Sequence, residues 1–63
     1  MHDDGLLTPV ELAQWLGVPV ATIYQSRTRG AGPRGLRVGR HLRFRTSDVR
    51  AWLDSLAEPN PAA

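Results

Sequence analysis

The sequence predicts a mainly α fold with a small β-hairpin. Two short helical patterns meet at a turn around Gly17, an alternating apolar and basic stretch fills residues 36–45, and a third helical pattern follows directly. A chain of 63 residues holds one small domain and buries only about 60% of the surface that it exposes when unfolded. We therefore expect one domain at residues 6–57, with flexible tails at residues 1–5 and 58–63.

The first helix is predicted at about residues 8–16. Thr8 and Glu11 have the spacing of a capping box, and Pro9 stands at the first helical position, where its missing N–H costs nothing. The apolar residues that follow recur at helical spacing, which gives the helix one face toward a core. Gly17 is expected to end it as a left-handed cap.

A second helix is predicted at about residues 20–28, only two residues after Gly17. Two helices joined by so short a turn form a helix-turn-helix. Ala13 is small where the helices would cross, and Val18 and Ile23 supply apolar anchors. Two positions depart from the usual preferences, because Pro19 provides no capping side chain and Ser26 stands where a large apolar residue would pack better.

Residues 30–35 hold three glycines and a proline, which predicts a loop. The same residues match G-x-G-x-x-G, the pattern of a dinucleotide-binding turn. That turn requires a strand before it and a helix after it, whereas here a helix precedes and a strand-like stretch follows. The pattern is therefore interpreted as a loop without nucleotide binding.

The alternation in residues 36–45 predicts two strands of a hairpin. A three-residue loop at Gly39–His41 would pair Val38 with Leu42 and Leu36 with Phe44, so that every apolar side chain shares the core face. We therefore expect an odd loop length. The opposite face would then carry three arginines, namely Arg37, Arg43 and Arg45.

The third helix is predicted to begin at Thr46-Ser47-Asp48, with a capping hydroxyl and an acid in the first turn. It is expected to end near Ala57. Helix, turn, helix, two-stranded wing and helix together predict a winged helix-turn-helix. The expected core consists of Leu6 or Leu7, Leu12, Trp15, Leu16, Val18, Ile23, Leu36, Val38, Leu42, Phe44, Val49, Trp52, Leu53 and Leu56.

The formal net charge of +2 conceals a strongly uneven distribution. Residues 20–50 hold all eight arginines and one acid, Asp48, a net charge of +7, and the segments on either side are acidic. Arginine makes paired hydrogen bonds to phosphate and guanine. A concentrated arginine block of this kind is the electrostatic pattern of a protein that binds nucleic acid.

Other classes of function find little support. The chain has no cysteine and two histidines far apart, and its carboxylates are dispersed, so we expect no enzyme activity, no metal site and no cofactor. No apolar run is long enough to span a bilayer, and the first residues lack the basic start of a signal peptide. A cytoplasmic protein without membrane association is expected.

Four segments of the sequence together carry a family resemblance. They are Leu6 to Pro19, Thr22-Ile23-Tyr24, Arg37 to Phe44 with Val38-Gly39-Arg40 at its centre, and Ser47 to Leu53. They resemble the excisionase and AlpA-like small DNA-binding proteins, relatives of the MerR-type winged helix. The resemblance implies double-stranded DNA binding, with the second helix in the major groove and the wing against the backbone or an adjacent minor groove.

The residues expected at the DNA fall into three groups. The major-groove group is Val20, Ala21, Thr22, Tyr24, Gln25, Arg27 and Thr28; the backbone group is Arg29, Arg34, Arg37, Arg43 and Arg45; the wing-tip group is Gly39, Arg40 and His41. Gln25 suits adenine, Ala21 suits a thymine methyl, and Arg27 and Arg29 would reach phosphate or guanine. Alternatives remain open for Tyr24 as a packing residue, His41 as a solvated turn residue, Arg37, Arg43 and Arg45 as a soluble sheet edge, and Arg50 as a partner of Asp54.

The sequence leads to an excisionase-type recombination directionality factor as the first hypothesis for function. Such a bacterial or phage-encoded protein bends DNA and steers an integrase toward excision; a chain with a wing and little space for an effector domain motivates the hypothesis. We expect a monomer in solution, with several copies bound cooperatively on nucleoid DNA beside an integrase or other recombinase. The alternatives are a small MerR/AlpA-type transcriptional regulator and an arginine-rich adaptor for an acidic protein.

Overall fold

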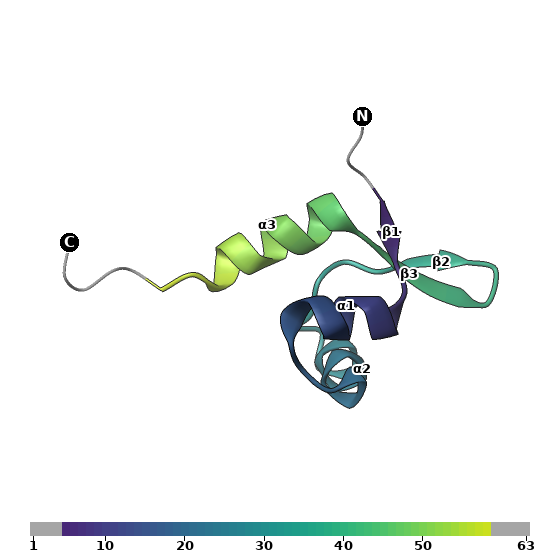
Figure 1. Ribbon diagram of the computed structural model, residues 1–63, viewed down its shortest axis with the longest axis horizontal. Helices are drawn as coiled ribbons and strands as arrows, with labels where there is room; N and C mark the ends of the chain where they lie inside the picture. The colour runs from purple at the N-terminus through teal and green to yellow at the C-terminus, as the bar shows by residue number, and fades with distance from the viewer. Residues whose placement is uncertain (1–4, 59–63) are drawn as a thin grey trace.

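The computed structural model describes residues 5–58. Its elements in chain order are β1 (Leu6–Leu7), α1 (Pro9–Leu16), α2 (Val20–Thr28), β2 (Leu36–Val38), β3 (His41–Arg45) and α3 (Thr46–Leu56). Figure 1 shows α1 and α2 grouped on one side of the sheet, the β2–β3 hairpin projecting from the body and α3 leading away in the opposite direction. The predicted combination of three helices and a hairpin is confirmed, with one further strand.

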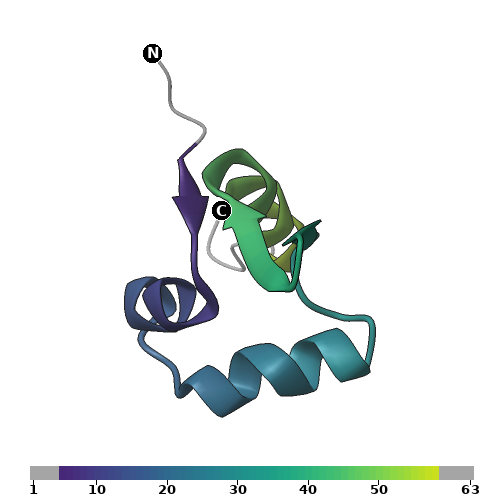
Figure 2. The same cartoon turned by 90° about the vertical axis from the view of Figure 1, so that its right-hand side faces the viewer.

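The predicted bounds of α1 and α2 are confirmed by local interactions. The capping box of α1 is formed in both directions, since the Glu11 N–H donates to Thr8 Oγ1 at 3.0 Å and the Thr8 N–H donates to Glu11 Oε1 at 2.9 Å. Gly17 ends α1 with a φ of +72°, and the Val18 N–H donates to the Ala13 carbonyl at 3.0 Å. This is a Schellman cap, and it turns the chain sharply into α2. Figure 2 shows α1 end-on and α2 side-on, the steep crossing of a helix-turn-helix.

The two unusual positions of α2 have structural explanations. Pro19 occupies the N-cap without a side-chain hydrogen bond, as expected. Ser26 is small because the loop after α2 folds back over it: its Cβ would lie 3.1 Å from a Cβ at Gly32, and its carbonyl accepts from the Ala31 N–H at 2.8 Å. A large apolar side chain at Ser26 would displace this loop.

The sheet has three antiparallel strands in the order β1-β3-β2. The strand β1 was not predicted, because two leucines are too short to show alternation. Leu6 pairs with Arg45 and Leu7 pairs with Phe44, and the Gly5 carbonyl extends this edge by accepting from the Thr46 N–H at 3.0 Å. The strand β3 is therefore central, with a neighbour on each side.

The predicted three-residue hairpin loop is wrong. Val38 pairs with His41, Arg37 with Leu42 and Leu36 with Arg43, so the loop consists of Gly39 and Arg40 alone. Gly39 has a φ of +63° and Arg40 has no positive φ, which is the pattern of a type II′ hairpin turn with glycine first. Glycine at the first turn position permits this two-residue loop.

The parity argument failed because β1 replaces β2 in the core. Leu7 packs against the core from the far edge of the sheet, on the same face as its partner Phe44. The core does not need the apolar residues of β2, and Val38 is 54% exposed. A consequence is that the three arginines do not share a face: Arg37 lies on the Leu42 face of the sheet, opposite Arg43 and Arg45.

The start of α3 also differs from the expectation. The N-cap is Arg45, the last residue of β3, and it makes no side-chain cap hydrogen bond. Thr46 is already helical, so no hydroxyl stands at the cap, and the strand continues into the helix without a loop. The expected acid in the first turn is confirmed, since Asp48 lies there with Arg45 Nη1 3.9 Å from its Oδ2. The helix ends at Leu56, close to the expected Ala57.

The core is small and lies between the sheet and the helices. Its buried side chains are Leu12, Ala13, Ile23, Leu42, Phe44 and Val49, with Leu7, Leu16, Val18 and Leu53 packed against them. Three residues expected in the core are exposed by about half, namely Trp15, Val38 and Leu56, and Leu7 rather than Leu6 is the packed member of its pair. Leu36 and Trp52 are partly exposed. Trp15 on α1 and Leu56 on α3 stay exposed because the three short helices and the small sheet of residues 5–58 leave no further element to cover them.

The burial of Phe44 gives the first prediction. Replacing this fully buried ring by alanine lowers the free energy of unfolding by about 3–5 kcal/mol. The total free energy of unfolding of a chain of this size is roughly 3–9 kcal/mol. We expect Phe44→Ala to be largely unfolded at 25 °C in a urea titration followed by circular dichroism. Val38→Ala, on the exposed β2 strand, is the control and should cost less than about 1 kcal/mol. Equal losses of stability in the two variants would contradict the conclusion that β3 belongs to the core and β2 does not.

Candidate nucleic-acid interface

One face of α2 is directed away from the core. Ile23 is buried, whereas the residues at helical spacing on the other side are exposed. These exposed residues are Val20, Ala21, Tyr24, Gln25 and Thr28. Thr22 and Arg27, the other predicted major-groove residues, are partly buried. Five of the seven residues therefore form a continuous outer face, and Thr28 Oγ1 is tied to it by donating to the Tyr24 carbonyl at 3.1 Å.

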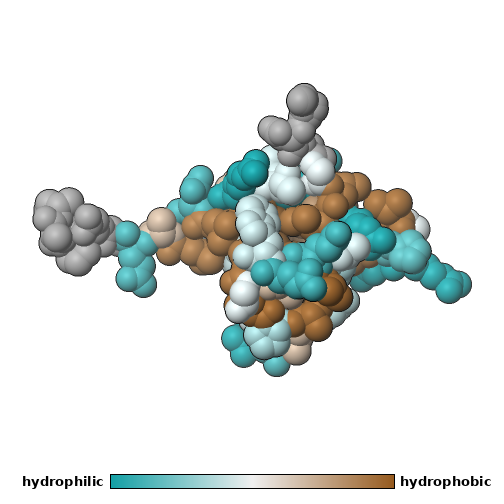
Figure 3. Space-filling model, viewed as in Figure 1, coloured by the Kyte–Doolittle hydropathy of each residue, from teal (hydrophilic) through white to brown (hydrophobic). Residues whose placement is uncertain are grey.

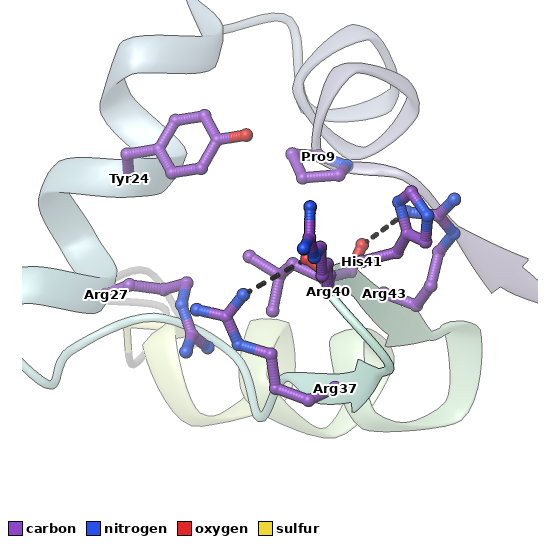
Figure 4. A pocket seen from close by; sticks show the side chains of 8 residues that line it. Pro9, Tyr24, Arg27, Arg37, Arg40, His41 and Arg43 are labelled. Carbon is purple, nitrogen blue, oxygen red and sulfur yellow. Dashed lines mark hydrogen bonds between the residues drawn. The ribbon is translucent and has the colours of Figure 1, made fainter.

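A pocket lies between α2, the start of α1 and the hairpin (Figure 4). Its volume is about 280 Å³. It is lined by Pro9, Tyr24, Arg27, Arg37, Arg40, His41, Leu42 and Arg43. We call it the arginine pocket. It joins predicted major-groove, backbone and wing-tip residues that are up to 19 positions apart in the sequence.

The arginine pocket has a strong positive charge. Four of its eight lining residues are arginines and none is acidic. Arg37 extends toward the hairpin tip, where its Nη1 donates a long hydrogen bond of 3.5 Å to the Arg40 carbonyl, and Arg43 Nη1 donates to the Leu42 carbonyl at 2.7 Å. Figure 3 shows the projecting hairpin end as strongly hydrophilic. Like charges gathered in this way favour an anionic ligand.

Four arginines lie outside the pocket. Arg29 at the C-cap of α2 and Arg34 in the following loop are exposed and do not line the pocket. Arg45 forms its ion pair with Asp48, whose Oδ2 is buried and has no hydrogen-bond partner at shorter range. The guanidinium of Arg50 lies 5.9 Å from the centroid of the Trp15 ring, the arrangement of a cation–π contact.

The three residues of the predicted wing-tip group lie at the hairpin turn and at the start of β3. Gly39, Arg40 and His41 are all exposed, and Arg40 and His41 also line the arginine pocket. Tyr24 is 51% exposed and lines the same pocket, which favours a ligand contact over packing between helices. Sequence reasoning missed Pro9 as a pocket residue, and the capping pattern that identified it contained no information about which element lies opposite.

The loop between α2 and β2 is held by both of its neighbours. Gly30, with a φ of +70°, begins a second Schellman cap at the end of α2. The Trp52 Nε1 of α3 donates to the Ala31 carbonyl at 2.9 Å. The G-x-G-x-x-G glycines thus serve helix ending and close packing, in agreement with their interpretation as a loop. This anchoring sets the position of the hairpin relative to α2.

The helix-turn-helix, the adjoining β-hairpin and the basic side that they share define a winged helix-turn-helix DNA-binding domain. A comparison with protein families matches residues 6–57 to the helix-turn-helix domain family, which includes AlpA-like and excisionase-like DNA-binding proteins. The chain belongs to this family, and it is a sequence-specific DNA-binding protein. Comparisons with curated proteins and with solved structures found no match.

Two further observations concern residues 5–58. No helix in this part of the chain is both long and apolar enough to cross a membrane. The same residues contain no cluster of three or more histidine or acidic side chains that would hold a metal ion.

The division between α2 and the hairpin tip gives the second prediction. Gln25→Ala removes a side chain suited to paired hydrogen bonds with adenine, worth about 1–3 kcal/mol of discrimination. It should therefore weaken binding to the cognate duplex while leaving binding to a scrambled duplex almost unchanged. Arg40→Ala should weaken both to a similar extent, because phosphate and groove-width contacts are shared by all sequences.

Both variants are measured by fluorescence anisotropy on the two duplexes. Arg50→Ala is the matched control, since it removes the same charge from α3 outside the arginine pocket. The reverse pattern, with Arg40→Ala losing sequence preference and Gln25→Ala losing general affinity, would show that the roles of α2 and the hairpin tip are exchanged.

Proposed function

We propose that the protein is an excisionase-type recombination directionality factor, which binds a specific duplex, bends it and steers an integrase toward excision. The observation that carries the proposal is that α2 and the hairpin tip border the same pocket. The outer face of α2 and the hairpin tip both adjoin the arginine pocket, so one duplex can contact α2 in its major groove and the hairpin at the neighbouring backbone or minor groove. The protein acts by binding, without catalysis.

The residue chemistry supports this docking. The outer face of α2 carries Gln25 for adenine and Ala21 for a thymine methyl, and Arg40 at the exposed tip suits a narrow minor groove. The charge is concentrated on this side, whereas Asp54 and Glu58 lie on or just beyond α3. Such a distribution orients the protein with its arginines toward the duplex and α3 away from it.

Bending follows from the same arrangement. A small body that engages a major groove and an adjacent segment together neutralises phosphates on one side of the duplex. Bending a site by 40–90° costs on the order of 1–6 kcal/mol, which extra contacts along the bent duplex offset. Several copies bound near an attachment site would add their bends, and this gives an integrase a differently shaped substrate. The protein would work in the cytoplasm, on nucleoid DNA.

A recombination assay gives the third prediction. With a partner integrase and supercoiled attachment-site DNA, adding the protein should raise the yield of excision and lower that of integration. Arg40→Ala should require a higher protein concentration for the same effect, and Arg50→Ala should behave as the unsubstituted protein does. If recombination direction does not change while duplex binding persists, the second candidate, a small MerR/AlpA-type transcriptional regulator with the same interface, takes its place.

The salt dependence of binding gives the fourth prediction. If the arginines on the duplex-facing side contact about four backbone phosphates in all, the logarithm of the association constant falls with the logarithm of salt concentration with a slope of about −3 to −4. Titrations of a duplex at several potassium chloride concentrations measure this slope. A slope near zero would instead favour the adaptor hypothesis, in which the arginines meet an acidic protein surface.

A further inference from the structure

We propose that the arginine pocket holds one phosphate of the DNA backbone, and that Arg27 binds this phosphate from a position set by Gly35. This inference rests on the proposed docking of α2 and the hairpin on one duplex. Of the two partners expected for Arg27, phosphate and guanine, it selects the sequence-independent phosphate contact.

The first argument is the direction of Arg27. It follows Ile23 by four residues in α2, so it leaves the helix on the side that faces the protein body. It is partly buried, whereas Tyr24, Gln25 and Thr28 on the outer face are exposed. Figure 4 shows its side chain extending from α2 toward the hairpin. Arg27 therefore lies at the pocket between α2 and the hairpin, apart from the outer face of α2 that is expected to enter the groove.

The second argument is the contact between Arg27 and Gly35. A Cβ at Gly35 would overlap Arg27 Nη1, would lie 3.3 Å from Arg27 Cζ and would lie 2.9 Å from Leu42 Cδ1. The Nη1 end of the guanidinium thus occupies the space beside the Gly35 backbone, just before β2, that a Cβ would need. The backbone of Gly35 needs no positive φ, so the glycine is required for space and not for conformation.

The third argument is charge. Arg45 has Asp48 as a partner, and Arg50 lies over the Trp15 ring. By contrast, a pocket whose lining contains no carboxylate is lined by Arg27, Arg37, Arg40 and Arg43. Guanidinium groups bind phosphate oxygens through paired hydrogen bonds, and the Tyr24 hydroxyl is a further donor at the rim. The ligand chemistry is therefore a phosphate oxyanion.

The position of the pocket selects the backbone of DNA as its source. The pocket is bounded by α2 on one side and by the hairpin on the other. A strand that passes from the groove occupied by α2 to the segment contacted by the hairpin crosses this pocket. One phosphate in the pocket would then set the spacing between the two contacts, whatever the sequence of the duplex.

A double-mutant cycle tests the proposal with Arg27→Ala, Gly35→Ala and the double variant, each titrated on cognate and scrambled duplexes. Adding a methyl group at Gly35 displaces the free end of the Arg27 side chain and also crowds Leu42 Cδ1 at 2.9 Å, so the fold of Gly35→Ala is checked by circular dichroism. We expect each single variant to lower the affinity for both duplexes about tenfold. Each should also reduce the slope of the logarithm of the association constant against the logarithm of salt concentration by about one. The double variant should be no weaker than Arg27→Ala, because Gly35 acts through Arg27.

Several results would overturn the proposal. A loss confined to the cognate duplex would make Arg27 a base reader, and additive losses in the double variant would separate Gly35 from Arg27. If circular dichroism shows that Gly35→Ala is unfolded, Arg27→Lys is compared with Arg27→Ala instead. Lysine keeps the charge but lacks the planar guanidinium, so Arg27→Lys should recover only part of the DNA affinity. An affinity equal to that of Arg27→Ala, or equal to that of the unsubstituted protein, would contradict the proposed phosphate contact.

A second titration distinguishes a phosphate of the DNA backbone from free inorganic phosphate as the ligand of the pocket. The Arg27 and Arg37 side-chain Nε–Hε signals are followed by NMR while inorganic phosphate or the cognate duplex is added to the free protein. Shifts of these signals with duplex, and none that saturate with millimolar inorganic phosphate, are expected. Saturable phosphate binding that competes with duplex would make the pocket a site for a free anion. If the unsubstituted protein binds no duplex at all, the proposed function fails together with this inference.

Discussion

The central strand β3 is the constraint on which the rest of the structure depends. Phe44 and Leu42 direct their side chains into the core, and Phe44 is fully buried. The same strand pairs with β1 on one edge and β2 on the other, and it continues without a loop into α3. The elements β1, β2, α1 and α3 all contact this strand, and α2 is placed through its packing on α1. A change in the packing of β3 would therefore affect the helices and the hairpin together.

This construction explains how so small a core supports a charged interface. Leu42 separates the core from the arginine pocket, since it is buried and also lines that pocket. Arg37 reaches the pocket because it pairs with Leu42 and shares its face. The guanidinium groups stay near solvent, where water reduces their mutual repulsion. A bound duplex would replace that repulsion with attraction and would raise the stability of the folded chain by mass action.

Much of the local structure was predictable because its causes are local. The capping box at Thr8 and Glu11 and the Schellman cap at Gly17 are formed by residues within one turn of each other, so their spacing in the sequence predicts their geometry. The same is true of the exposed face of α2, which follows from helical periodicity around Ile23. The basic character of the middle of the chain was predictable from charge alone, because every arginine lies within residues 20–50.

The sequence by itself therefore determined the helices, the existence of the hairpin and the choice of a polyanion as ligand. Only the tertiary structure decided the register of the hairpin, because Leu7 entered the core from an unpredicted strand and released Val38 to the surface. It also decided which arginines line one pocket, because the Arg27 side chain of α2 lies beside Gly35, next to the hairpin that carries Arg37. Periodicity and capping act within a few residues, whereas strand pairing and shared pockets depend on segments far apart in the chain.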